Sequence, residues 1–113
     1  MARAPRAREK DAPAEAVARV IYSPVALHDL ERSFEFLAER DPKAAVGAMQ
    51  AIRSAVDILA NHPLVGRVRD GEVRELVISF GASGYLALYR DWAVPRIVRV
   101  LGFRHQRELD YPV

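Results

Sequence analysis

The sequence contains no cysteine, which excludes disulfide bonds, thiolate metal sites and cysteine nucleophiles. It also has no apolar run near the roughly 18 residues that a membrane span needs. No apolar stretch follows the charged N-terminus, as it would in a secretory signal. We therefore expect a cytoplasmic protein with no membrane partner.

The signatures of several enzyme classes are also missing. No Gly-rich loop joins a predicted strand to a helix, and no serine lies in a nucleophile motif. His28, His62 and His105 fall in three different predicted elements, so no histidine pair has metal-ligand spacing. We therefore expect no metal ion, no cofactor and no conventional catalytic triad.

The composition is that of one small globular domain. The chain has 113 residues, of which 50% are hydrophobic and 28% are charged, and its mean hydropathy is -0.08. The formal charge of +2 arises at the N-terminus, where four basic residues accompany one acid within residues 1–10. We expect residues 1–15 to form a flexible basic tail and residues 16–113 to form the single domain.

Two helices are predicted in the first half, after an apolar strand over residues 16–22 that should pair inside a sheet. Ser23-Pro24 and Asp41-Pro42 each combine an N-cap side chain with a proline in the first helical turn. The first helix should run to about residue 40, with Asp29 exposed, and the second to about residue 61. Almost nothing connects them, so they should form an antiparallel hairpin. Their apolar stripes have helical spacing: Leu27, Leu30, Phe34 and Leu37, then Ala45, Met49, Ile52, Val56 and Leu59.

The second half of the chain changes to short extended segments. Strands are predicted over residues 73–79, 85–90 and 96–103, with turns that contain glycine or proline between them. Such short connections require antiparallel neighbours. The predicted fold class is therefore α+β, with the order β-α-α-β-β-β and a helical hairpin packed on a small, mainly antiparallel sheet.

Arginine is concentrated in and after these strands. Arg74 and Arg99 each lie in phase with apolar residues of their own strand. An arginine in such a position needs a partner, because burying an unpaired guanidinium group is costly. Two interpretations remain open. The first is a structural ion pair with Glu72 or Glu75, and the second is a concave sheet face whose guanidinium groups bind phosphates or an acidic partner.

A second group of polar residues follows the last strand. His105 could move a proton near neutral pH, and Arg104 and Arg107 could stabilise the negative charge of a transition state. With Tyr111, these are parts from which a metal-free ribonuclease could be assembled. A charged chain end that is simply solvated is the other interpretation.

Over most of its length, from about Arg19 to Tyr111, the sequence resembles the RelE/ParE superfamily of toxins from type II toxin–antitoxin systems, also known as plasmid stabilisation proteins. The known fold of that superfamily is the β-α-α-β-β-β order predicted above. The resemblance lies in motifs that occur in the superfamily's order and spacing: Ser23-Pro24-x-Ala26-x-x-Asp29-Leu30, Leu59-x-x-His62-Pro63-x-x-Gly66-Arg67, Val73-Arg74-Glu75-Leu76-Val77, Tyr85-x-x-x-Tyr89-Arg90 and Ile97-x-Arg99-Val100-Leu101.

The resemblance implies one of two activities. ParE-like toxins inhibit DNA gyrase by a protein–protein contact, whereas RelE-like toxins cut mRNA on the ribosome with basic residues of the sheet and a His, Arg or Tyr near the C-terminus. Ribonuclease members usually carry arginine directly after a Gly-Tyr pair, where this chain has Leu86, and often a second basic residue on the preceding strand, where it has Leu76. Both departures should remove phosphate-facing charge, which favours the ParE branch.

We therefore expect a ParE-like toxin that binds DNA gyrase without catalysis and is neutralised by a cognate DNA-binding antitoxin encoded upstream. One alternative is a ribosome-dependent mRNA endonuclease, in which His105 or Tyr111 transfers protons while Arg74 and Arg104 hold phosphate. Another is an inactive relative that acts only with its antitoxin. The residues expected to contact the target are Arg74, Arg99, Arg104, His105 and Arg107.

Overall fold

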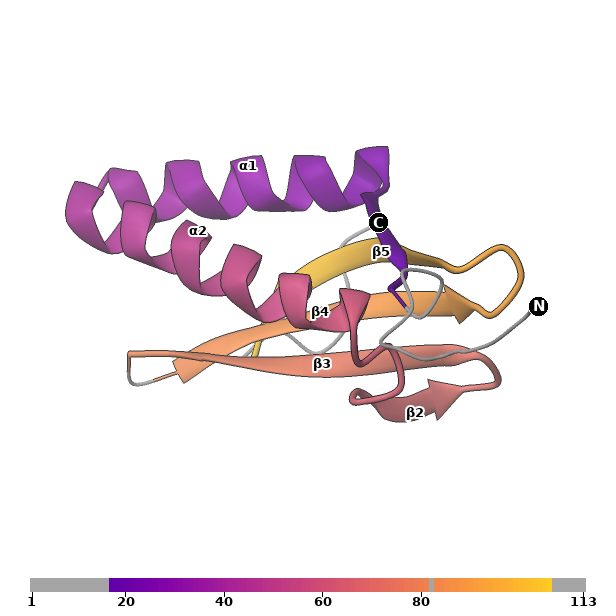
Figure 1. Cartoon of the computed structure of the whole chain (residues 1–113). Helices are drawn as coiled ribbons and strands as arrows, with labels where there is room; N and C mark the ends of the chain where they lie inside the picture. The colour runs from indigo at the N-terminus through magenta and orange to yellow at the C-terminus, as the bar shows by residue number, and fades with distance from the viewer. Residues whose placement is uncertain (1–16, 82, 107–113) are drawn as a thin grey trace.

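The computed structural model describes residues 17–81 and 83–106. Two layers form the fold: a helical hairpin lies on one face of a five-stranded sheet (Figure 1). In chain order the elements are β1 (Arg19–Tyr22), α1 (Pro24–Ala38), α2 (Pro42–Asp57), a 3-10 turn η2 (Ile58–Ala60), β2 (Arg67–Asp70), β3 (Val73–Phe80), β4 (Ser83–Trp92) and β5 (Ile97–His105).

The sheet has the strand order β1-β5-β4-β3-β2. β1 pairs with β5 in parallel, and the other neighbours are antiparallel. The predicted α+β fold class is confirmed, with two corrections. β1 begins at Arg19 and is an edge strand, not an interior one. The four-residue strand β2 was not predicted, because its sequence RVRD has one apolar side chain and all four residues are exposed.

Both helix starts follow the prediction. The Ser23 hydroxyl accepts a hydrogen bond from the Ala26 amide at 3.0 Å, and the Asp41 carboxylate accepts one from the Ala44 amide at 3.2 Å. A proline occupies the first turn of each helix. These caps satisfy amides that the first helical turn leaves without a backbone partner, so each helix begins directly after its cap residue. The stripe of α2 is also confirmed, and its buried members are Ala45, Ile52, Val56 and, in η2, Leu59.

The predicted stripe of α1 is wrong in part. Leu27 and Phe34 are 54% and 38% exposed, whereas Ala26 and Asp29 are buried. The reason is the position of α1, which packs against α2 and β5 through a narrow face. On that face the Asp29 carboxylate accepts a hydrogen bond from the backbone N–H of Phe103 in β5, at 3.0 Å. Asp29 is therefore buried, although the sequence pattern had predicted that it is exposed. Part of the α1 stripe lies on the surface instead.

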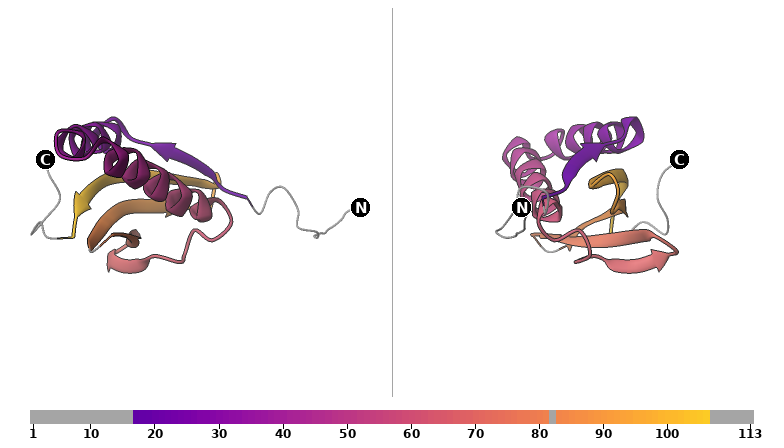
Figure 2. Two further views of the ribbon diagram at one scale, coloured as in Figure 1. Left: turned by 90° about the vertical axis from the view of Figure 1, so that its left-hand side faces the viewer. Right: turned by 45° about the vertical axis from the view of Figure 1, so that its right-hand side comes forward.

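The core fills the space between the hairpin and the sheet. Its largest fully buried side chains include Tyr89, Phe103, Ile52 and Leu59. Figure 2 shows both helices on the same side of the strands. Within the described ranges, no helix covers the opposite side of the sheet, which we call the open face.

Candidate functional site

The site residues predicted from the sequence lie on opposite faces of the sheet. Successive side chains of a strand point to opposite faces. Arg74 pairs with Tyr89, and His105 pairs with Tyr85; both tyrosines belong to the core cluster under the helices. Arg74 and His105 are therefore on the helix-facing side. Arg104, one residue before His105, is on the open face.

Arg74 holds the loop of residues 63–66 in place. Its Nη1 atom donates hydrogen bonds to the carbonyl oxygens of Leu64 and Gly66, at 3.2 and 2.8 Å. The predicted ion pair with Glu72 or Glu75 is thus wrong for Arg74, because its guanidinium group points away from the face on which Glu75 lies. Leu76 is also on the helix-facing side, packed against the core.

Tyr89 of β4 also holds the 63–66 loop. Its hydroxyl donates to the Pro63 carbonyl at 2.7 Å and accepts from the Gly66 amide at 2.9 Å. Burial raises the pKa of the Tyr89 phenol above its usual 10.0. A Cβ atom on Gly66 would lie 2.6 Å from the Tyr89 hydroxyl oxygen and 2.9 Å from the Glu75 carbonyl oxygen. This close approach explains why the motif Pro63-x-x-Gly66 needs glycine.

A cluster of charged groups occupies the open face. Glu75 is 5% exposed, and its Oε1 atom accepts hydrogen bonds from Nε and Nη2 of Arg67, at 3.0 and 2.6 Å. Its Oε2 atom accepts one from Nη1 of Arg69 at 3.3 Å and lies 3.9 Å from Nη2 of Arg104. We call these four residues the Glu75 cluster. The ion-pair interpretation therefore holds for the open face, but with arginines other than Arg74.

The rest of the open face is mixed. Leu86 pairs with Val77 on one side and with Arg104 on the other, and Val77 is 47% exposed. Arg99 is exposed on β5, opposite Arg90 in the register, and Arg90 donates a hydrogen bond to Glu72. The open face thus combines arginines, carboxylates and apolar side chains.

His105 has an aromatic neighbour. Its ring meets the Tyr85 ring edge-on, with centroids 5.4 Å apart and an interplanar angle of 87°. Burial raises the pKa of the Tyr85 phenol. Because His105 and Arg104 project from opposite faces of β5, the two side chains do not converge on one site. Arg107 and Tyr111, the other C-terminal candidates, lie outside the described residues.

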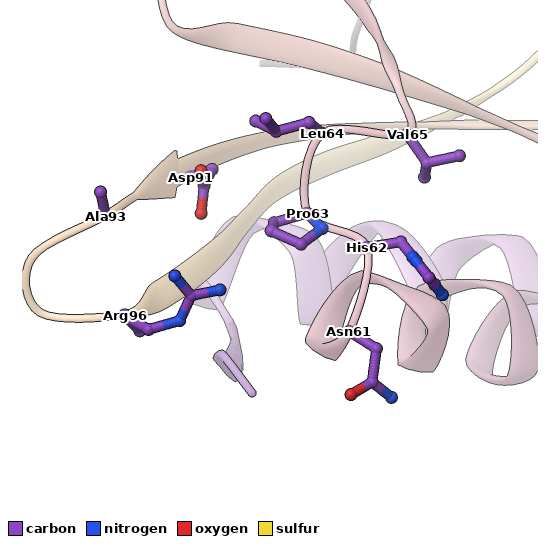
Figure 3. Close-up of a pocket in the computed structure, with 8 residues that line it drawn as sticks. All are labelled: Asn61, His62, Pro63, Leu64, Val65, Asp91, Ala93 and Arg96. Atoms are coloured by element: carbon purple, nitrogen blue, oxygen red, sulfur yellow. The ribbon is translucent and has the colours of Figure 1, made fainter. Parts of the chain in front are cut away.

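A pocket that the sequence did not indicate lies beside the loop. It has a volume of about 610 Å³ and is formed by residues 61–65 and the end of the β4–β5 hairpin. Figure 3 shows Pro63 and Leu64 pointing toward Asp91 and Arg96. Leu64 and Val65 are 61% and 58% exposed. The 63–66 loop is therefore fixed to the sheet by Arg74 and Tyr89, while it exposes apolar side chains to solvent.

The described residues contain no group of three or more side chains suited to hold a metal ion. In the same ranges, no helix is both long and apolar enough to cross a membrane.

The chain matches a family model described as the ParE toxin of the type II toxin-antitoxin system parDE, over residues 20–110. Among curated proteins it is similar to "Toxin RelE3" of Caulobacter vibrioides, with 39% identity over 85 residues, which cover 75% of this chain and 90% of that protein. It is also similar to "Toxin RelE1" of the same organism, with 38% identity over 71 residues, which cover 63% of this chain and 76% of that protein.

Two solved structures share the fold. One is a chromosomal ParDE toxin–antitoxin system from P. aeruginosa, with a TM-score of 0.68 and 19% identity, covering 80% of this chain and 97% of that chain. The other is the toxin–antitoxin complex RelBE2 from Mycobacterium tuberculosis, with a TM-score of 0.54 and 21% identity, covering 81% of this chain and 94% of that chain. At these identities the likeness concerns the fold.

Proposed function

Since the chain belongs to the ParE toxin family of the RelE/ParE superfamily, and so is the toxin of a type II toxin–antitoxin system, we propose that it inhibits DNA gyrase by binding it. Gyrase is the target that resemblance to the ParE branch implies, and it places the action in the cytoplasm. One observation carries the choice of binding over RNA cleavage. Arg104 and His105 project from opposite faces of β5, so they cannot act together on one phosphate.

The composition of the open face supports the same choice. A phosphoryl transition state must be neutralised by positive charge directed at one point. Here Leu86 stands where ribonuclease members usually carry arginine, next to Arg104 in the register. Glu75 places a carboxylate among the arginines that remain. This face suits contacts with a protein better than the stabilisation of a cleaving phosphate.

We place part of the gyrase contact at the pocket beside the 63–66 loop. Exposed apolar side chains on a rigid segment lose little conformational freedom on binding, and they mark interaction sites on small proteins. Leu64 and Val65 meet this description. Arg74 then acts as a positioning residue for the loop, and Arg99 is a contact group on the open face.

The antitoxin is a separate partner. The solved neighbours are toxin–antitoxin complexes, and we propose that this chain also pairs with a cognate antitoxin. An amphipathic segment of that antitoxin would cover the exposed part of the α1 stripe, at Leu27 and Phe34.

A ribosome-dependent ribonuclease is the second candidate, because the curated relatives carry the name RelE. Induction of the full chain in growing cells separates the two activities. We expect plasmids to lose negative supercoiling while the 5′ ends of translated mRNA stay unchanged, and His105→Ala to remain toxic. Cuts at codon positions that disappear with His105→Ala would support the ribonuclease. An unchanged pattern in both readouts would indicate a relative that acts only with its antitoxin.

A further inference from the structure

The Glu75 cluster has an arrangement that the gyrase contact does not require. Among the described residues, three guanidinium groups, from β2 and β5, approach one buried carboxylate on the open face. The fork of Arg67 donates two hydrogen bonds to a single oxygen of Glu75 while its side chain is 66% exposed. Arg67 and Arg69, whose side chains are 66% and 37% exposed, therefore reach inward from the surface to Glu75.

Arginine binds carboxylate and phosphate through the same planar fork. A group of arginines that satisfies a carboxylate is thus also placed to satisfy a phosphodiester at that point. Beside the cluster, Arg90 and Arg99 face each other in the register of β4 and β5. Together these side chains form a band of arginines across the open face, of the kind that binds a nucleic-acid backbone without reading its sequence.

We propose that Glu75 keeps a latent phosphodiester-binding site on the open face closed. Its carboxylate occupies the donors that a phosphate would use, and its negative charge repels a phosphate from the same position. The residue thereby determines specificity: it keeps the open face for protein contacts and keeps RNA and DNA away. The inference deepens the proposed function, which assigns this face to protein, but its test does not depend on gyrase.

Glu75→Gln tests this inference, because glutamine keeps the size of the side chain and removes its charge. The probes are a short single-stranded RNA of mixed sequence and the matching DNA, and binding is followed by fluorescence anisotropy over a range of salt. We expect both to bind about tenfold more tightly or better. Each phosphate newly bound should steepen the dependence of log affinity on log salt by about 0.7. Tighter binding of RNA alone would indicate that the variant recognises the ribose and not the phosphate, which would contradict the proposal.

Glu72→Gln is the matched control. It removes the same charge from a neighbouring carboxylate that is 68% exposed and pairs with Arg90. We expect its RNA affinity to stay within about twofold of the unmodified chain, since an exposed ion pair is largely screened. An equal increase in affinity in the two variants would mean that net charge alone sets the affinity, and would overturn the proposal. So would an unmodified chain that already binds RNA as tightly as Glu75→Gln.

A second comparison does not depend on the folding of Glu75→Gln. Arg67 and Arg99 are both exposed, and Arg67→Ala and Arg99→Ala change the net charge equally. In the proposal, Glu75 already occupies the guanidinium group of Arg67, so this arginine contributes little to RNA binding. Arg67→Ala should therefore weaken the residual RNA binding at low salt less than Arg99→Ala does. The reverse order would contradict the proposal. Inhibition of gyrase, measured on the same samples, shows separately whether the proposed function holds.

Discussion

At the scale of single residues, Tyr89 fixes the loop of the proposed site. Its hydroxyl joins two points of the 63–66 loop, the Pro63 carbonyl and the Gly66 amide, and its ring lies in the core. Arg74 adds two hydrogen bonds to the same loop. Because a buried carbonyl or amide without a partner costs free energy, these contacts fix the loop in one conformation.

Tyr89→Phe should lower the free energy of unfolding by about 1–3 kcal/mol, because it leaves the Pro63 carbonyl and the Gly66 amide without their partner. Urea unfolding followed by circular dichroism measures the loss. Tyr22→Phe is the control: it keeps the ring that stacks on Phe103, and its effect should stay within about 0.5 kcal/mol. Equal losses in the two variants would show that the hydroxyl of Tyr89 holds nothing.

At the scale of elements, α1 and its cap are attached to the sheet by polar groups as well as by apolar ones. β1 pairs with β5 up to Val100, and past that point residues of α1 and its cap take over the edge. The Ser23 hydroxyl donates to the Leu101 carbonyl at 3.2 Å, and Asp29 accepts from the Phe103 amide. The helix start therefore replaces a missing length of strand.

Asp29→Ala should destabilise the protein by about 1–3 kcal/mol, because the Phe103 amide would lose its acceptor in a buried place. Glu31→Ala, at an exposed position of the same helix, should change stability by less than about 0.5 kcal/mol. Thermal unfolding of the two variants provides the comparison. If both melt alike, the carboxylate of Asp29 does not dock α1.

The sequence predicted the elements whose signal is local. N-caps with proline and the α2 stripe are read from neighbouring residues, and the structure confirms them. The burial of Asp29 was not predictable, because it depends on an amide of β5 that lies 74 positions away in the chain. The site was predicted less well than the fold. Alternation along a strand groups residues by face, but it does not say which face the helices cover, so Arg74 and Arg104 were assigned to one surface.

At the scale of the whole molecule, the two-layer fold leaves two separate surfaces. The exposed α1 stripe lies in the helix layer, and the pocket lies where the loop after η2 meets the β4–β5 hairpin (Figures 1 and 3). α1 packs over β5, which lies toward one edge of the sheet. The loop leads into β2, which forms the opposite edge. A toxin built this way can contact its target and its antitoxin with different residues.

Leu64→Asp and Leu27→Asp should therefore have opposite effects. Both leucines are more than half exposed, so neither change should prevent folding. Leu64→Asp should weaken gyrase inhibition by about tenfold or more, as expected for an interface hot spot, and leave antitoxin binding within about threefold. Leu27→Asp should weaken antitoxin binding and spare inhibition. Titration against purified gyrase and purified antitoxin measures both effects, and loss of both activities in either variant would contradict two separate surfaces.

We propose that this toxin stops gyrase by binding it and needs no catalytic histidine. The supercoiling of relaxed plasmid by purified gyrase tests it most directly, with increasing amounts of the full chain and of His105→Ala. Both proteins should inhibit supercoiling at the same concentrations, and the inhibition should saturate as it does for a stoichiometric binder. Supercoiling that continues unchanged at a large excess of the folded toxin would contradict it.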